Sequence, residues 1–180
     1  MADEGASPKE IVLEASRRNN TDLLHDVLEQ FNKTHGKKAP EAIAQLLNSA
    51  RDGIGMGVLH LAAVGGNYDV LDLLLDQEGL EIDELDRMDK DTPLHKAVRY
   101  TNELDKANWD VGQQIVDILI DAGCDPRIRN AAKLRPFDLV DPRNKELRTL
   151  LQQAEYSMTM GDDVVQEDDD GPTGSGSESD

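Results

Sequence analysis

The chain has 180 residues, of which 19 are Lys or Arg and 37 are Asp or Glu, so its formal net charge at pH 7 is −18. This length suffices for one sizeable hydrophobic core. The negative charge argues against direct binding of nucleic acid or an anionic membrane surface, because both need Lys and Arg to displace counterions. It favours a basic protein partner, or it serves only to keep the protein soluble.

The cysteine count and the lack of long apolar runs indicate where in the cell the protein is located. Cys124 is the only cysteine, so no intrachain disulfide is possible, and a reducing compartment fits. The N-terminal stretch MADEGASPKE is acidic and lacks an apolar core, so we do not expect a signal or transit peptide. No run reaches the roughly 18 apolar residues that a membrane span needs. We expect a cytoplasmic protein that can also occur in the nucleus, and no membrane contact.

The N-terminal third predicts a short leader, a first pair of helices and a connector. Residues 1–8 are expected to be disordered. Apolar residues recur at helical spacing in 9–31, and the polar remainder suits a terminal unit with one face in water. In the connector 32–51, Pro40 opens a short apolar-periodic segment, which predicts an extra short helix.

The stretch from Gly55 to Asp83 contains two short apolar segments separated by Gly65-Gly66. This pattern predicts two short antiparallel helices joined by a tight turn. A single pair of this size cannot bury both of its apolar faces, so a neighbouring unit of the same kind is expected.

The same pattern recurs further along the chain. DTPLHKAV at 91–98 restates GVLHLAA, and IVDILIDAGCDP at 115–126 restates VLDLLLDQEGLEID. These motifs resemble the ankyrin-repeat family, whose pattern is roughly D-x-x-G-x-TPLH-x-AA-x-x-G-H-x-x-VV-x-LLL-x-x-GA-D-P. The resemblance implies an all-α solenoid of about four helix-turn-helix units with short hairpin loops, within residues 9–156. The units are expected at 9–31, 52–84, 85–126 and 127–153.

The resemblance also implies structural roles for the TPLH positions. In the family, the histidine of this motif bonds locally and holds neighbouring loops together, and Thr is the N-cap of the first helix. Gly57-Val58 replace Thr-Pro in the second unit, so we expect a weaker helix start there. Asp138 takes the histidine position in the last unit, as is typical of closing repeats. The structural motif residues are His60, Thr92, Pro93, His95, Pro136 and Asp138.

Two segments depart from a plain repeat. About ten extra residues, within 101–112, are expected between the two helices of the third unit, close to the only tryptophan, Trp109. This tryptophan either packs on the repeat itself or anchors a partner. The last segment, 157–180, lacks an apolar period; residues 161–180 hold eight Asp or Glu and no Lys or Arg, which predicts a disordered acidic tail.

The acidic tail suggests an internal contact. Four basic residues gather in the last inter-repeat loop: Arg127, Arg129, Lys133 and Arg135. We hypothesise that the tail folds back on this loop and competes with a partner there, since tethering raises its effective concentration. Each exposed ion pair would contribute little and would be screened by salt.

No catalytic or cofactor site is expected. His25 and His35 lack Cys, Asp or Glu at metal-ligand spacing, and Cys124 takes a small packed position in the repeat's last turn. The chain is therefore interpreted as a non-enzymatic protein, with no cofactor and no metal.

The resemblance instead implies protein binding, because ankyrin arrays present a concave surface made of inter-repeat loops and first helices. We expect a monomer with one protein partner. One hypothesis is an escort or chaperone for a basic client, for which small acidic ankyrin proteins that escort ribosomal proteins are a precedent. The alternative is a regulatory adaptor or inhibitor that docks on a folded enzyme or assembly. The residues expected to contact the partner are Arg17, Arg18, Leu61, Val64, Asp86, Met88, Asp89, Lys96, Arg99, Tyr100, Trp109, Arg127, Arg129 and Lys133.

Overall fold

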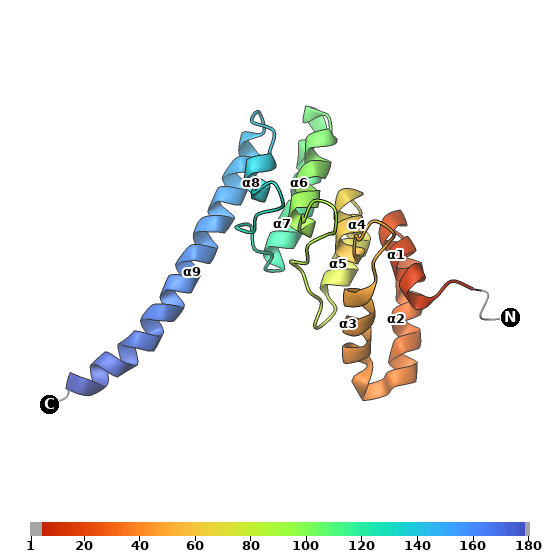
Figure 1. Ribbon diagram of the computed structural model, residues 1–180, viewed down its shortest axis with the longest axis horizontal. Helices are drawn as coiled ribbons and strands as arrows, with labels where there is room; N and C mark the ends of the chain where they lie inside the picture. Colours follow the sequence, from red (N-terminus) through yellow and green to blue (C-terminus); the bar gives the residue numbers. More distant parts are fainter. Residues whose placement is uncertain (1–4, 179–180) are drawn as a thin grey trace.

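A computed structural model describes residues 5–178, with side chains described as far as residue 162. Throughout this described part the regular structure is helical, and no strand occurs in it. The helices stack side by side along the chain (Figure 1). The prediction of an all-α solenoid of helix pairs is confirmed. In chain order the helices are α1 (Pro8–Arg18), α2 (Thr21–His35), η2 (Gly36–Lys38), α3 (Ala39–Ser49), α4 (Val58–Val64), α5 (Tyr68–Leu75), α6 (Pro93–Glu103), η3 (Lys106–Asn108), α7 (Trp109–Asp121), α8 (Pro136–Leu139) and α9 (Lys145–Glu178).

The helices form two layers, because each unit contributes one helix to each layer. The first helices α1, α4, α6 and α8 contact one another in sequence, and α2, α5 and α7 do the same in the second layer. The extra helix α3 lies in the predicted connector and covers α1 and α2. Inter-repeat loops connect the second helix of one unit to the first helix of the next, so they all emerge from the same edge of the stack.

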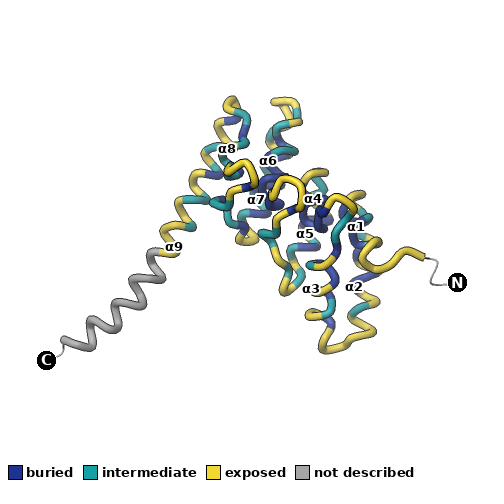
Figure 2. The backbone as a smooth tube through the Cα atoms, in the orientation of Figure 1, coloured by how far each residue is buried: buried dark blue, intermediate teal, exposed yellow. Residues whose placement is uncertain are grey.

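The core runs along the whole stack, between the two layers (Figure 2). Leu24, Leu71 and Leu94 have no exposed surface, and burial of a leucine contributes roughly 1.5–3 kcal/mol. Alanines at the centre of the first helices, Ala62 and Ala97, are also fully buried, which lets neighbouring first helices approach closely. The sum of these contacts explains why helices as short as α4 and α5 are stable, since helices of this length are marginal in isolation.

Three expected boundaries are wrong. Helix α1 begins at Pro8, inside the predicted leader, because the Ser7 hydroxyl caps it by accepting from the backbone N–H of Glu10 at 3.3 Å. Residues 1–4 lie outside the described part. Helix α2 continues through residue 35, into the predicted connector. The inserted residues of the third unit mostly lengthen its helices, because α6 runs on to Glu103 and α7 starts at Trp109.

The predicted start of the disordered tail at residue 157 is also wrong. Residues 157–162 continue α9, which packs against α8 near its N-terminal end. In the more acidic remainder, 163–180, the backbone continues α9 as far as Glu178, and the side chains beyond residue 162 and residues 179–180 lie outside the described part.

Close packing within the third unit predicts an unequal response of two helical glycines to substitution. A methyl group at Gly112 of α7 would overlap the side chain of Thr101 on α6, whereas one at Gly161 of α9 would meet nothing within 4 Å. Overpacking of this kind costs about 1–3 kcal/mol, against a gain of about 1 kcal/mol in helix propensity. Gly112→Ala should therefore lower the urea unfolding midpoint, and Gly161→Ala should leave it unchanged or raise it. Equal midpoints for the two variants would contradict this packing.

Candidate partner-binding surface

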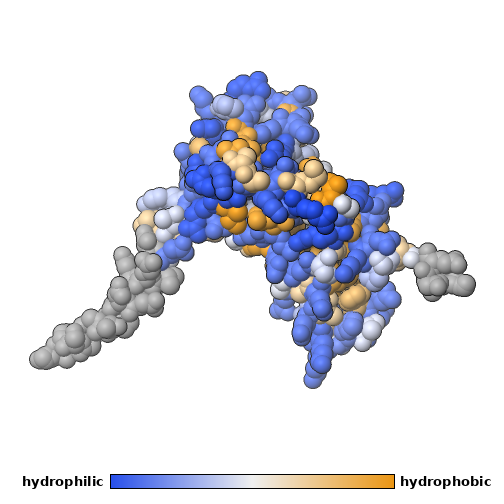
Figure 3. Space-filling view, in the orientation of Figure 1, coloured by the Kyte–Doolittle hydropathy of each residue, from blue (hydrophilic) through white to orange (hydrophobic). Residues whose placement is uncertain are grey.

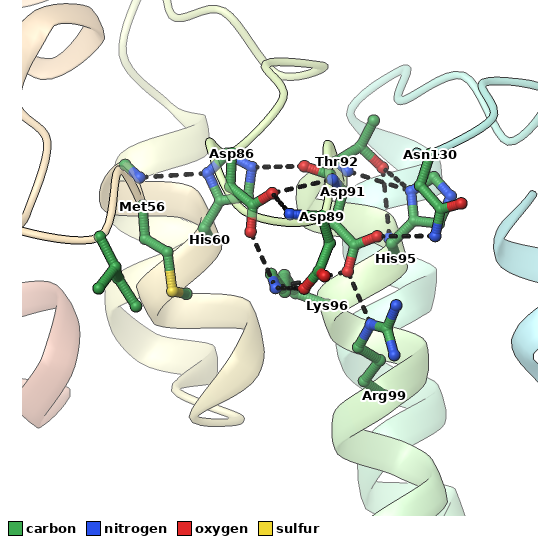
Figure 4. Close-up of polar contacts among 12 residues, drawn as sticks. Met56, His60, Asp86, Asp89, Asp91, Thr92, His95, Lys96, Arg99 and Asn130 are labelled. Atoms are coloured by element: carbon green, nitrogen blue, oxygen red, sulfur yellow. Dashed lines mark hydrogen bonds and ion pairs between the residues drawn. The ribbon is translucent and has the colours of Figure 1, made fainter. Parts of the chain in front are cut away.

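Two buried histidines join consecutive inter-repeat loops (Figure 4). The backbone N–H groups of Gly57 and Thr92 donate to Nδ1 of His60 and His95, at 3.2 and 3.1 Å. Nδ1 is therefore an acceptor, which places the proton of the neutral ring on Nε2. The Nε2–H of His60 faces the carbonyl oxygens of Glu84 and Asp91 at 3.0 and 2.9 Å.

His95 repeats this arrangement one unit later. Its Nε2–H donates to the carbonyl oxygen of Leu134 at 2.8 Å. The helix starts themselves differ: the Thr92 hydroxyl accepts from the backbone N–H of His95 at 3.3 Å, whereas Gly57 has no side chain to cap α4. Each histidine thus ties the start of its own first helix to the loop that follows.

Burial keeps both histidines neutral. The exposed fractions of His60 and His95 are 1% and 0%. Burial lowers the pKa of both imidazoles, more strongly than the neighbouring backbone carbonyls and carboxylates raise it. The neutral ring is also the form whose Nδ1 can accept the hydrogen bonds described above.

A buried ion cluster lies directly beneath the third loop. Nζ of Lys96 lies 2.9 Å from Asp86 and 3.4 Å from Asp91, and Nε of Arg99 lies 2.6 Å from Asp91. Burial by itself would raise the pKa of both carboxyls, but their hydrogen bonds and the two cations outweigh it and hold each pKa below its usual value. The second oxygen of Asp91 accepts from the amide of Asn130 at 2.9 Å, which extends the cluster to the fourth loop.

This cluster corrects part of the predicted contact set. Asp86 and Lys96 are 1% and 7% exposed, and Leu61 is 7% exposed, so these three residues are internal and cannot form the outer contact surface. Lys96 and Asp86 are buried because the Lys96 side chain extends behind the third loop and forms ion pairs with the aspartates of that loop.

Three inter-repeat loops share one local geometry. A side-chain oxygen accepts two backbone N–H groups in each: Asp52 in the second unit, Asp86 in the third and Asn130 in the fourth. In each loop a residue with positive φ follows: Gly55 at 86°, Lys90 at 57° and Lys133 at 68°. Glycine adopts this conformation without steric cost, whereas lysine does not.

The three loops also touch one another and form a continuous edge. Gly55 packs against Arg87, where no room for a side chain remains. The carbonyl oxygen of Asp89 accepts from the backbone N–H of Ala131 at 2.8 Å. We call this edge the loop row, defined as residues 52–56, 85–91 and 129–134.

The loop row exposes large apolar side chains beside charged ones. Ile54, Leu85 and Met88 are 51%, 45% and 64% exposed. Among the predicted contacts, Met88, Asp89, Arg129 and Lys133 are accessible here. Sequence reasoning did not single out Ile54, Leu85, Arg87 and Lys90, although their position in the loop tips was a usable signal.

Comparison with known proteins agrees with this architecture. Residues 13–130 match the family model of ankyrin repeats in three copies. The chain belongs to the ankyrin-repeat family. It is 42% identical over 181 aligned residues to the ankyrin repeat-containing protein YGL242C of Saccharomyces cerevisiae. The alignment covers 96% of this chain and 95% of the yeast protein. Ankyrin repeats generally mediate protein–protein interaction.

The first helices of the ankyrin stack add fewer accessible side chains than expected. Arg17 and Arg18 are exposed, but both pair with Glu14 at 2.6 Å. Val64 is 40% exposed. Arg99 and Tyr100 are half-buried, the tyrosine ring against Gly66 of the preceding unit and Arg99 against the ion cluster. The remaining predicted motif residues, Pro93, Pro136 and Asp138, lie in the first turns of α6 and α8, where Asp138 accepts from the backbone N–H of Arg135 at 2.9 Å.

Trp109 lies away from the loop row, at the start of α7. Its ring is half-buried, and the guanidinium of Arg143 lies 5.9 Å from the ring centroid. The indole N–H is buried and has no acceptor among the described residues. Trp109 therefore packs on the ankyrin stack itself, against the segment that precedes α9.

Two cations of the predicted basic loop already contact α9. Arg127 lies 2.8 Å from Asp162, and Arg135 lies 2.8 Å from Glu155. Arg127 is thus engaged within the chain. The hypothesis of a folded-back tail concerns mainly residues 163–180, which lie outside the described side chains.

The described residues show no metal site, no membrane-spanning helix and no activated cysteine. Among the described residues, no three His, Cys, Asp or Glu side chains gather as a metal site, and no helix is long and apolar enough to cross a membrane. Burial raises the pKa of the Cys124 thiol, so this cysteine is not a ready nucleophile.

The histidine geometry predicts a pH-dependent stability. Because the folded-state pKa of His60 and His95 lies below 6.5, stability is fully present above that value and is lost as pH falls and the unfolded chain takes up protons. Between about pH 7.5 and about pH 5.5 the free energy of unfolding should fall, by at most about 1.4 kcal/mol per histidine. Urea unfolding at both pH values measures this loss.

A histidine control separates this effect from general titration. The exposed pair His25 and His35 can be replaced together by Asn, and this variant should keep the same loss of stability. A wild-type protein whose free energy of unfolding stays constant across this pH range would contradict neutral, buried motif histidines.

The positive φ angles predict that two lysines destabilise the fold. Lys90→Gly and Lys133→Gly should each raise the free energy of unfolding by about 0.5–1 kcal/mol, because glycine relieves the left-handed strain at some entropic cost. Lys33→Gly, in the last turn of α2, is the control and should lower it, because glycine has a low helix propensity and the substitution removes the ion pair of Lys33 with Glu29. Thermal unfolding of the three variants would disprove the strain if all three lost stability equally.

Proposed function

We propose that this ankyrin protein is a non-enzymatic interaction module that binds one protein partner along the loop row. The observation that carries the proposal is the row of exposed Ile54, Leu85 and Met88, which lie on two of the three loops that contact one another. Exposed apolar side chains that gather in a patch often mark an interaction site. Apolar patches also lie over the middle of the stack, within a mostly hydrophilic surface (Figure 3).

The loops that present these side chains are held in place before any partner binds. Their backbone N–H groups are satisfied by Asp52, Asp86 and Asn130, and the two motif histidines connect them. A preorganised surface loses less conformational entropy on association, so more of the contact free energy contributes to affinity. This favours the adaptor hypothesis, in which the row docks on a folded partner.

The escort of a basic client is a second candidate, supported by a different surface. Exposed aspartates gather on the second helices rather than on the loops. They are Asp22 and Asp26 on α2, Asp69 and Asp72 on α5, and Asp110 and Asp121 on α7. A basic client would bind this second-helix layer. The single cysteine supports a reducing cytoplasmic or nuclear location for either function.

Affinity capture can decide between the two surfaces. The tagged full chain is used to capture proteins from a cytosolic extract at low and high salt, and bound proteins are quantified by mass spectrometry. Ile54→Ser/Met88→Ser should reduce capture of the main partner about tenfold, since both exposed side chains lose apolar contact. Val111→Ser, at an apolar residue of α7 that is 41% exposed, is the control and should retain capture.

A third variant tests the second candidate. Asp69→Asn/Asp72→Asn removes two exposed charges from α5. Loss of a basic partner with this variant, together with full retention by Ile54→Ser/Met88→Ser, would disprove binding at the loop row and favour the escort function. All variants must first show the unfolding midpoint of the wild type.

A further inference from the structure

The loop row carries positive charge on a strongly acidic protein. Its exposed charged side chains are four cations and one carboxylate: Arg87, Lys90, Arg129 and Lys133 against Asp89. The formal charge of the whole chain is −18. The sign of the charge on this edge is therefore opposite to that of the molecule.

The buried ion cluster explains this reversal. The loop aspartates Asp86 and Asp91 are 1% and 0% exposed, because Lys96 and Arg99 hold them on the inner side. In Figure 4 both carboxylates point toward these two cations, below the backbone of the loop. The carboxylates are thus withdrawn from the surface, and cations remain on the outer side.

Two of the outer cations occupy strained backbone positions. Lys90 and Lys133 have φ of 57° and 68° at the place that Gly55 takes in the second unit. Glycine would satisfy the loop geometry at both places. Among the described residues no ion pair engages either lysine, so neither ammonium compensates the strain within the fold. Strained backbone positions that the surrounding structure holds in place, as the hydrogen bonds to Asp86 and Asn130 do here, cluster at functional sites.

We propose that the loop row binds an acidic segment of the partner protein, with Asp or Glu side chains against Lys90 and Lys133 and an apolar side chain against Met88. The proposal rests on the proposed function and names the chemistry of the partner. The apolar side chains favour a peptide over a nucleic acid, because phosphates would leave Ile54, Leu85 and Met88 without contacts. The large negative charge elsewhere would also repel a long polyanion.

Fluorescence anisotropy with a defined probe tests this charge preference. The probe is a short labelled peptide in which Glu alternates with Gly and Ser around a central Leu; its neutral analogue carries Gln at each Glu. The full-length chain should bind the Glu peptide, with an affinity that falls as salt rises, and should bind the Gln peptide about tenfold more weakly.

Lysine variants separate charge from structure. Lys90→Gly/Lys133→Gly should weaken binding of the Glu peptide about tenfold although its fold is more stable, so a loss cannot be attributed to unfolding. Lys90→Arg/Lys133→Arg should retain binding. The matched control Lys38→Gln/Lys106→Gln removes two exposed cations from η2 and η3 and should also retain it.

Several outcomes would overturn the proposal. These are equal affinity for the Glu and Gln peptides, an equal loss with the matched control, or tighter binding of a single-stranded RNA of the same length that responds to the same lysines. A tenfold gain in affinity on replacing Asp168, Asp169 and Asp170 by Asn would assign the row to the chain's own tail instead of a partner. If Ile54→Ser/Met88→Ser abolishes capture while the Glu peptide fails to bind, only this inference falls. If capture is unaffected, the proposed function itself falls.

Discussion

The hydrogen bonds from Nε2 of His60 and His95 to the carbonyl oxygens of the next loop are the constraint on which the rest of this structure depends. Helix packing brings the units together, but it does not determine where an irregular loop lies. The two histidines determine the position of the next loop. A buried N–H without an acceptor is costly, and the next loop supplies the carbonyl oxygens that accept from Nε2–H. The loop row is continuous because each loop is tied to its predecessor.

The ion cluster around Lys96 is a second constraint on the conformation of the third loop. A buried lysine needs carboxylate partners, and Asp86, Asp89 and Asp91 supply them at 2.9, 3.7 and 3.4 Å. Asp86 at the same time accepts the backbone N–H groups that shape the third loop. One side chain therefore couples loop conformation to surface charge. The outer side of the loop row is cationic as a consequence of internal ion pairing and not of composition.

The segments that this chain adds to the plain ankyrin repeat are not part of the loop row. Helix α3 and the extended ends of α6 and α7 with Trp109 lie away from the loop row, whereas α9 contacts Arg127 and Arg135 on either side of its last loop. Their contacts are mainly with the chain itself, as with Arg143 over Trp109 and Asp162 on Arg127. We interpret them as supports of the stack, which leaves the loop edge free for association.

The sequence by itself determined the helix pairs, the repeat and the motif histidines, because apolar spacing, turn glycines and the TPLH pattern act over a few residues. It also predicted that the inter-repeat loops contribute to partner contact, which stays a prediction. Only the tertiary structure decided which loop residues reach solvent: Asp86 is internal and Asp89, three positions later, is outside. Likewise Lys96 is buried whereas Lys90 is exposed. The physical reason is that burial of a polar side chain depends on partners from neighbouring units, and local sequence pattern carries no information about which partners the packed repeats bring within reach.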